Sequence, residues 1–162
     1  MASNLEFIKS QSANNVTSLI VSNMFSDKYE VYEVFVSGNG SQNVSSLSAE
    51  FLDSSDNDIG QGNYHTAIYR LRVTHAFDPV RTQGANSFEY AYPSSTDNDF
   101  ASKFTIYNPF SSSAFTYATI QSASIYGEKN AIACKVTTSA TGMKFSANQH
   151  YTPIRVSVYG VK

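Results

Sequence analysis

The side chains best suited to chemistry in this sequence are the carboxylates of one polar segment. Asp53, Asp56 and Asp58 supply oxygen ligands at short spacing, as calcium-binding loops do. The EF-hand pattern is nevertheless absent, because the sixth position counted from Asp53 is not glycine and the twelfth is Tyr64 rather than Glu. We therefore interpret the segment as a solvated polar turn and expect no calcium site in it.

The histidines and the cysteine form no zinc-binding pattern. His65 and His75 are expected near opposite ends of one extended strand, about 30 Å apart at ~3.3 Å per residue. No His-x-His pair occurs and Cys134 is the only cysteine, so neither a zinc site nor an internal disulfide is expected. Cys134 lies in an alternating apolar segment, which predicts a buried structural thiol.

No catalytic constellation can be recognised either. A glycosidase needs two carboxylates about 5–10 Å apart across a cleft, and nothing in the sequence pairs Glu33, Glu50 or Glu89. Serine is abundant, but the Gly-x-Ser-x-Gly motif of a nucleophile elbow is absent. We therefore expect no catalytic, cofactor-binding or metal-binding residues and predict that the protein is not an enzyme.

The composition argues against two classes of partner. The 11 basic and 13 acidic residues give a net charge of −2, whereas nucleic-acid binders and electrostatically attached membrane proteins carry basic patches. Charged residues make up 15% of the chain, against about 25% in a typical domain, and Ser, Thr and Asn replace them. A surface of hydroxyls, amides and tyrosines suits packing against neighbouring subunits or contact with sugars.

The N-terminal sequence carries no secretory signal. Residues Met1–Glu6 lack the basic and apolar regions of a signal peptide, and no apolar run approaches the ~20 residues of a spanning helix. Because glycosylation of such patterns requires secretion, those at Asn15 and Asn39 are expected to be coincidental. Synthesis in a cytoplasm is expected.

The periodicity of apolar residues predicts an all-β chain. β-Branched and aromatic residues are densest over residues 29–37, which are expected to form a central strand. Asn39-Gly40 directly after it predicts a hairpin turn. A further turn is expected at 127–130, and long loops over 53–63 and 76–86. The expected strands are residues 5–9, 15–22, 29–37, 46–53, 64–75, 88–92, 100–106, 115–126, 131–138, 143–146 and 154–162.

Strands of this number, without a sequence repeat, predict a single domain over residues 1–162, a two-sheet β-sandwich of the jelly-roll type. The segments 5–9 and 154–158 are expected to share a sheet. One long strand alternates clearly enough to assign its faces. Its expected core-facing residues are Ala67, Tyr69, Leu71 and Val73, and its outward residues are Arg70, Arg72 and Thr74.

Seven aromatic residues allow two interpretations, a packed core or a platform for stacking sugars. Alternation favours the core for most of them, and tryptophan is absent. In the alternative, replacing Tyr90 or Tyr92 with alanine would abolish glycan binding. The seven residues are Phe88, Tyr90, Tyr92, Tyr107, Phe110, Phe115 and Tyr117.

Four segments together resemble a known group of proteins: Leu5–Lys9, Phe25–Val34, Tyr107–Ser113 and Ile154–Lys162. A short strand leading to Phe-Ser-…-Tyr-x-x-Tyr, with a terminal Ile-x-Val-x-Val-Tyr-Gly-Val-Lys, is similar to small virion structural proteins of tailed marine bacteriophages, including those of cyanobacteria. The resemblance spans most of the chain in order. It implies a jelly-roll subunit on the virion, as a head decoration protein or a tail-associated fibre or adhesin part, often trimeric. It implies no catalytic residue.

The sequence therefore predicts a non-enzymatic virion structural protein of a tailed phage, a capsid decoration subunit made in the host cytoplasm and located in the virion. The expected partners are further copies of the chain in a homotrimer, with the strand over 115–126 at the seam, and other virion proteins such as the major capsid protein. The alternative is a carbohydrate-binding jelly roll or tail-fibre adhesin that binds host surface glycans. No cofactor, nucleic acid or membrane is expected.

Overall fold

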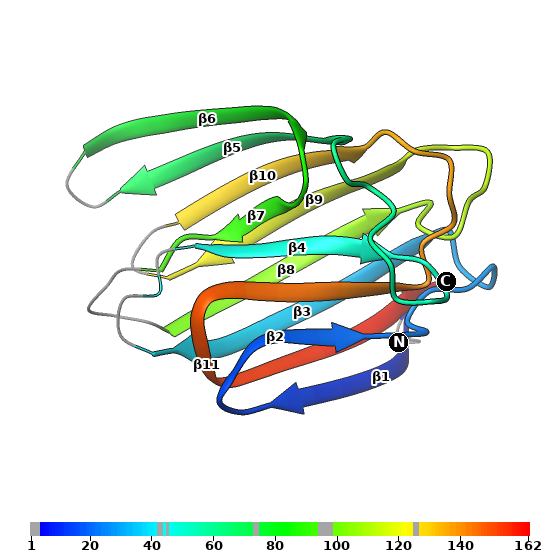
Figure 1. Ribbon diagram of the computed structural model, residues 1–162, viewed down its shortest axis with the longest axis horizontal. Helices are drawn as coiled ribbons and strands as arrows, with labels where there is room; N and C mark the ends of the chain where they lie inside the picture. The colour runs from blue at the N-terminus through cyan, green and yellow to red at the C-terminus, as the bar shows by residue number, and fades with distance from the viewer. Residues whose placement is uncertain (1–3, 42–43, 45, 73–74, 94–98, 125–126) are drawn as a thin grey trace.

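Strands make up the regular structure of this protein. The computed structural model describes residues 4–41, 44, 46–72, 75–93, 99–124 and 127–162, and within them it contains eleven antiparallel strands and no helix (Figure 1). The all-β prediction is confirmed. Within those residues there is accordingly no helix of the length and apolarity needed to cross a membrane.

The strands differ widely in length, from four residues to twenty. In chain order they are Leu5–Ala13 (β1), Val16–Val21 (β2), Val31–Gly40 (β3), Leu47–Leu52 (β4), Tyr64–Arg72 (β5), His75–Ala85 (β6), Phe88–Ala91 (β7), Asp99–Tyr107 (β8), Thr116–Ala123 (β9), Gly127–Cys134 (β10) and Gly142–Val161 (β11).

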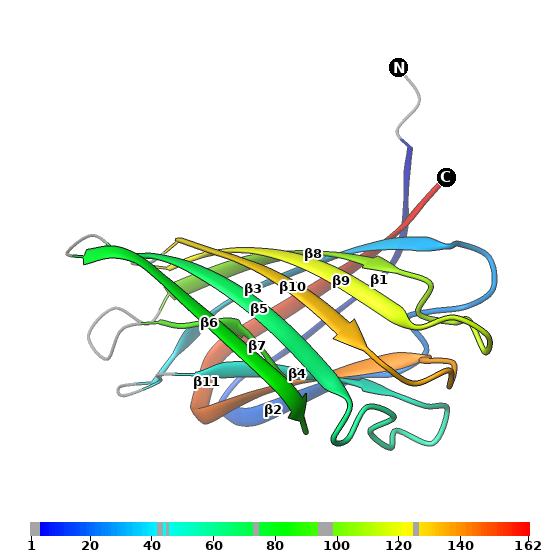
Figure 2. The same cartoon turned by 90° about the horizontal axis from the view of Figure 1, so that it is seen from above.

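The strands form two layers that share β11. The large sheet runs in the order β6-β5-β10-β9-β8-β3-β11-β1, and the small sheet in the order β2-β11-β4-β7. The first part of β11 pairs with β2 and β4, and its last part with β1 and β3. Figure 1 shows β11 turning a corner between these parts, and Figure 2 shows the two layers edge-on. This arrangement is a β-sandwich of the jelly-roll type, as predicted.

The core lies between the two sheets and is rich in aromatic rings. Phe145 of the small sheet meets Phe104 of the large sheet edge-on, with 5.9 Å between ring centroids, and meets Tyr90 of β7 at 6.0 Å. All three side chains are fully buried. Burying a ring of this size stabilises a fold by roughly 1.5–3 kcal/mol, so these rings hold the layers together.

The central strand predicted over residues 29–37 is confirmed as β3. It pairs with β8 on one side and β11 on the other, and Tyr32, Val34 and Val36 point into the core. The alternating pattern of β-branched and aromatic residues fits this half-buried surface. The prediction that residues 5–9 and 154–158 share a sheet is also confirmed, because β1 pairs antiparallel with the end of β11.

The hairpin predicted at Asn39-Gly40 is wrong. β3 continues through Gly40, and its partners are β8 and β11 rather than β4. The Asn39 amide donates a hydrogen bond to the Asp99 carboxylate of β8, at 2.7 Å, so it belongs to the sheet. The turn predicted at 127–130 is wrong as well, because β10 begins at Gly127.

Two further boundaries differ from the prediction. The loop expected over 76–86 is strand β6, which carries Pro79 and Gly84 at the edge of the large sheet, where interrupted pairing is tolerated. The short strand expected at 143–146 and the terminal strand expected at 154–162 are parts of the single bent strand β11.

Candidate functional site

Strand β5 faces the opposite way from the sequence prediction. Its outward-facing side chains include Tyr69 and Leu71, which are 51% and 56% exposed, while Ile68 and Arg70 are buried. The prediction placed Tyr69 and Leu71 in the core and Arg70 in solvent, and this assignment is wrong. The faces predicted for Val73 and Thr74 concern positions outside the described residues. The reversal places a tyrosine on the outer face of the large sheet.

The buried arginine is accommodated by an ion-pair network between the layers. The Arg70 guanidinium donates from Nε to Glu128 Oε1, at 2.9 Å, and from Nη2 to Glu89 Oε1. It also lies over the ring of Tyr92, 4.7 Å from the centroid. Asn130 Nδ2 donates to the backbone carbonyl of Glu89, at 3.1 Å. These contacts offset the cost of burying a charge.

Burial sets the protonation behaviour of this network. Burial raises the pKa of the carboxyls of both Glu89 and Glu128, and the Arg70 charge opposes this shift. For Arg70, burial disfavours the charged form, but the two carboxylates outweigh it and the pKa of the guanidinium is raised. Arg70 therefore keeps its charge, and the two glutamates depend on it for theirs.

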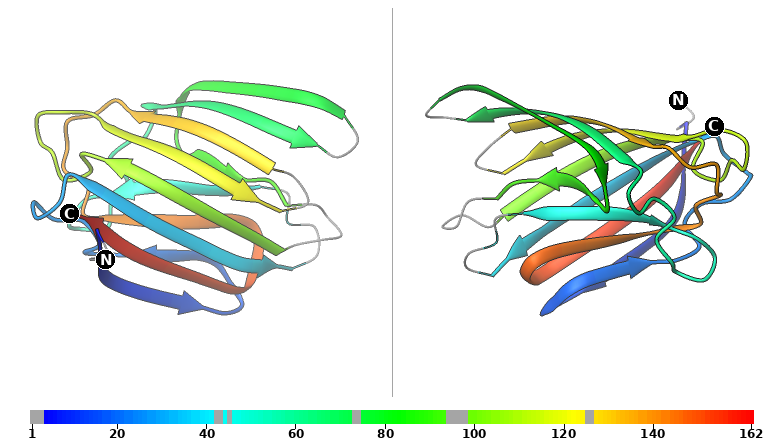
Figure 3. Two further views of the ribbon diagram at one scale, coloured as in Figure 1. Left: turned by 180° about the vertical axis from the view of Figure 1, so that it is seen from behind. Right: turned by 45° about the horizontal axis from the view of Figure 1, so that its top comes forward.

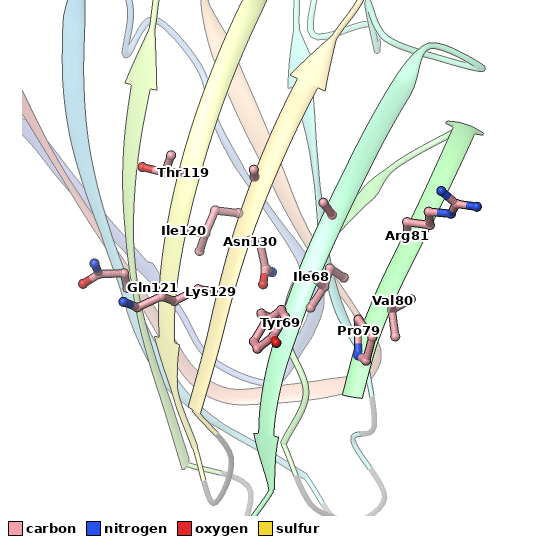
Figure 4. A pocket seen from close by; sticks show the side chains of 12 residues that line it. Ile68, Tyr69, Pro79, Val80, Arg81, Thr119, Ile120, Gln121, Lys129 and Asn130 are labelled. Carbon is pink, nitrogen blue, oxygen red and sulfur yellow. The ribbon is translucent and has the colours of Figure 1, made fainter. Parts of the chain in front are cut away.

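The outer face of the large sheet contains a hollow of about 580 Å³. It lies over β9, β10, β5 and β6, and Figure 4 views it from outside, with the small sheet behind. Small side chains form its floor, and longer ones surround them. The floor is Ala67, Thr119 and Ala131, and the surrounding side chains are Tyr69, Pro79, Arg81, Gln121 and Lys129.

Strand register explains why these residues meet. Tyr69 of β5 is paired with Lys129 of β10 on one side and with Pro79 of β6 on the other. One step along the same face, Ala67 is paired with Ala131 and Arg81. Because side chains two apart on a strand point to the same face, the tyrosine and both basic side chains project outward around small residues.

This arrangement is suited to binding rather than to catalysis. Tyr69 offers an aromatic ring, and Thr119, Gln121, Lys129 and Arg81 offer hydrogen-bonding groups of several kinds. Among the described residues that line the hollow, none is a carboxylate, a cysteine or a histidine. The hollow therefore provides stacking and hydrogen bonding without an evident acid, base or metal ligand.

The aromatic residues singled out from the sequence divide between core and surface. Phe88 and Tyr90 are fully buried, and the Tyr90 hydroxyl lies 3.0 Å from that of Tyr151. Replacing Tyr90 would therefore perturb the core and does not test ligand binding. Tyr107 and Tyr117 are a cross-strand pair on the outer face and are exposed. Phe115 is exposed as well, whereas Tyr92 and Phe110 are half-buried.

The carboxylates of the acidic loop are occupied by their own loop and by its neighbours. Asp53 Oδ1 accepts hydrogen bonds from the backbone of Asn57 and Ser55, at 2.9 and 2.8 Å, and these bonds lower the pKa of Asp53. Asp58 Oδ1 accepts from Gly60 N at 2.9 Å and from the Tyr64 hydroxyl at 2.8 Å. The loop is thus closed by local hydrogen bonds, and Asp56 joins it to Ser22.

The remaining candidate residues lie apart. Glu33 pairs with Lys103 on the large sheet and Glu50 with Lys144 on the small sheet, while Glu89 belongs to the Arg70 network. In the part of the chain that the structure describes, no three His, Cys, Asp or Glu residues are grouped to hold a metal ion.

Two of the three histidines lie on different strands, and the cysteine is buried. The strand expected over 64–75 ends at Arg72, so His65 and His75 lie on separate strands, β5 and β6, rather than on one. Cys134 is buried at the end of β10, as predicted, and burial raises the pKa of its thiol to about 11. The thiol is therefore neutral at pH 7.

Comparison with known proteins yields matches among solved structures. No protein-family model and no curated protein matches the sequence. Exo-inulinase from Aspergillus awamori is similar over 98% of this chain and 29% of that chain, with 14% identity and a TM-score of 0.44. Fructofuranosidase from Schwanniomyces occidentalis, complexed with fructose, is similar over 99% of this chain and 35% of that chain, with 8% identity and a TM-score of 0.28. This chain spans about a third of their length, and likeness of this degree carries no information on function.

Proposed function

We propose that this protein binds glycans without cleaving them, through the hollow on the outer face of the large sheet. The observation that carries the proposal is Tyr69, half exposed beside a hollow whose lining combines small, apolar and hydrogen-bonding residues. A sugar presents an apolar face of C–H groups and an edge of hydroxyls. A tyrosine ring packs against the first, and Arg, Lys, Gln and Thr side chains bind the second.

The chemistry of the hollow supports binding over hydrolysis. Glycoside hydrolysis needs a pair of carboxylates flanking the bond that is cleaved. Glu33, Glu50 and Glu89 each have a separate basic partner, and none of them is among the residues lining the hollow. A bound sugar would therefore contact hydrogen-bond donors and an aromatic ring, and we expect the protein to bind the glycan without hydrolysing it.

Tyr69→Ala is expected to weaken glycan binding by about fivefold or more, because loss of a stacking ring costs about 1 kcal/mol or more. Tyr69→Phe keeps the ring and is expected to retain most of the affinity. A glycan array with the wild-type protein identifies the ligand, and isothermal titration calorimetry then measures the variants. Tyr117→Ala is the matched control, because Tyr117 is an exposed tyrosine on the same face outside the hollow. Equal affinity for wild type and Tyr69→Ala would contradict the proposal.

A second candidate function, a virion structural subunit, is favoured by an exposed ring cluster. Phe7 of β1 and Phe35 of β3 both contact the ring of Tyr159 on β11, with centroids 5.6 and 5.7 Å apart. Phe7 is 58% exposed. Exposed aromatic clusters are enriched at protein interfaces. This cluster suits contact with another copy of the chain in a homotrimer, or with another virion protein such as the major capsid protein. Because β9 lies within the large sheet, the seam expected there would involve the sheet's outer face.

The virion proposal predicts a stable oligomer and a fixed copy number. Light scattering at micromolar concentration is expected to give a trimer, and the double variant Phe7→Ser, Phe35→Ser is expected to dissociate it. A strict monomer at that concentration would remove the trimer. Mass spectrometry of purified virions distinguishes the positions, because hundreds of copies indicate the head and a handful the tail. Absence from virions would refute the whole role.

A further inference from the structure

One line of paired residues crosses the outer face of the large sheet. It runs from Pro79 on β6 through Tyr69, Lys129, Gln121 and Lys103 to Phe35 on β3, and each is the register partner of the next. All lie on the same face, and the left view in Figure 3 looks onto these strands from outside. Five strand steps at ~4.8 Å make this line about 24 Å long. We name these six residues, together with Arg81 on the same face of β6, the outer row.

The surface along the outer row is hollowed from end to end. Beyond the hollow around Tyr69, a second of about 460 Å³ is lined by Phe35, Lys103 and Gln121, together with small residues of β3, β8 and β9. A third of about 430 Å³ includes Tyr69, Gln121 and Lys129. Gln121 belongs to all three, so the hollows are contiguous. A continuous track with a ring near each end accommodates a polymer better than a single sugar.

Charge along the track is positive, although the protein as a whole has a net charge of −2. Lys129 and Arg81 line the first hollow, and neither forms an ion pair with a described residue. Lys103, in the second hollow, pairs with Glu33 at 2.7 Å and lies 5.8 Å from the ring centroid of Phe35. The described residues that line the three hollows include one acidic residue, Glu128, and its side chain points into the core.

Lys129 and Arg81 lie on opposite sides of Tyr69, on β10 and β6, with β5 between them (Figure 4). Two strand steps put their backbones about 10 Å apart across the sheet. Like charges at this spacing repel each other weakly in water, and both would attract an anion bound between them. Arginine also binds carboxylate and sulfate oxygens through two parallel hydrogen bonds.

We infer that the outer row binds a linear anionic polysaccharide, one that carries carboxylate or sulfate groups along its chain, and that the polymer lies across the strands. The inference rests on the proposed glycan-binding function and names its ligand class. Tyr69 and Phe35 pack against sugar rings near the two ends, Gln121 binds hydroxyls at the centre, and Lys129 with Arg81 neutralises acidic groups.

The test compares pairs of ligands that share a sugar backbone, one member charged and the other neutral. Binding of polygalacturonate and of its methyl ester is measured by calorimetry at low and high salt, and dextran sulfate and dextran form the second pair. The anionic member of one pair is expected to bind at least about tenfold more tightly at low salt, which is about 1.4 kcal/mol, because charge-assisted hydrogen bonds are stronger than neutral ones. Added salt should reduce the preference, and the pair that shows it identifies the acidic group.

Variants assign the effect to the outer row. Lys129→Gln and Arg81→Gln are expected to abolish the preference for the anion, because affinity for the anionic member should fall much more than affinity for the neutral one. Arg155→Gln is the matched control, because Arg155 is an exposed basic residue of β11 outside the row. With galacturonide oligomers of increasing length, affinity should rise until the oligomer spans the row, and Phe35→Ala should remove the gain from the longer ones only.

The possible outcomes separate this inference from the proposed function. Equal affinity for charged and neutral members of both pairs would overturn the anionic ligand and leave glycan binding intact. No affinity for any glycan would overturn both. Equally tight binding of oligothymidylate would show a general polyanion surface and would overturn the assignment to polysaccharides. A preference unchanged in Lys129→Gln and Arg81→Gln would place the anion elsewhere.

Discussion

Replacing Arg70 with methionine is expected to lower the free energy of unfolding by about 3–5 kcal/mol at pH 7. Arg70 is the basic partner of both Glu89 and Glu128, and the Glu128 side chain is 1% exposed. Methionine fills much of the volume but carries no charge, so one carboxylate would be left buried without compensation and another partly so. Urea denaturation followed by circular dichroism measures the loss.

The deficit of Arg70→Met should depend on pH, and its sign follows from the shifted carboxyls. Burial raises the pKa of Glu89 and Glu128 above the ordinary 4.5. Protonating these two carboxyls therefore stabilises the folded state. This contribution is complete below pH 4.5 and is lost as the pH rises through their pKa values in the folded protein. Without Arg70 the two pKa values should rise further, which increases the loss at pH 7. The difference between variant and wild type should shrink as the pH falls from 7 to 4.

Two further variants distinguish charge from packing. Arg155→Met makes the same substitution at an exposed position and should change stability by no more than about 0.5 kcal/mol. Adding Glu128→Gln to Arg70→Met removes the most deeply buried carboxylate and should recover part of the loss. An Arg70→Met deficit that is equal at pH 4 and pH 7 would show that Arg70 contributes by packing alone.

The same arginine explains why the candidate site was not predicted from the sequence. The alternation over residues 64–75 predicts a strand, but it assigns the two faces of that strand the wrong way round. Judged by residue type, Ala67, Tyr69 and Leu71 are the more apolar set, and Arg70 belongs in water. What reverses the preference is the pair of carboxylates, 19 and 58 residues away in the chain. A local sequence pattern contains no information on partners at such separations. Because the pattern assigns Tyr69 to the core, it does not predict the outer row either.

Elements determined by local pattern were predicted well. The alternation in β3 identifies a central strand because apolar residues at every second position fit one buried face. The hairpin predicted at Asn39-Gly40 and the loop predicted around Pro79 are wrong for a different reason. Asn-Gly favours a turn only when the next strand is the hairpin partner, and β3 pairs elsewhere. Pro79 interrupts a strand at a sheet centre but is tolerated in the edge strand β6, and which strand lies at the edge is a property of the whole sheet.

Phe145→Ala is the second substitution with a large expected effect, a loss of about 3–5 kcal/mol in the free energy of unfolding. Phe145 is fully buried in the first part of β11, where its ring packs edge-on against Phe104 of the large sheet and Tyr90 of β7. Alanine would leave a cavity between the layers, because close-packed neighbours relax only partly. Urea denaturation of the variant and the wild type measures the difference.

Phe7→Ala provides the comparison for Phe145→Ala. Phe7 is also a strand phenylalanine paired with β11, but it lies on the exposed side and should cost less than about 1 kcal/mol. Equal losses would mean that the layers are not held together by the aromatic core.

Lys103 and Thr105 flank Phe104 on β8 and point outward, so the strand that carries part of the outer row is anchored by the ring that Phe145 contacts. While Phe145→Ala remains folded, its glycan affinity should match wild type, because the ladder between β8 and its neighbours fixes the row independently of the cavity behind it.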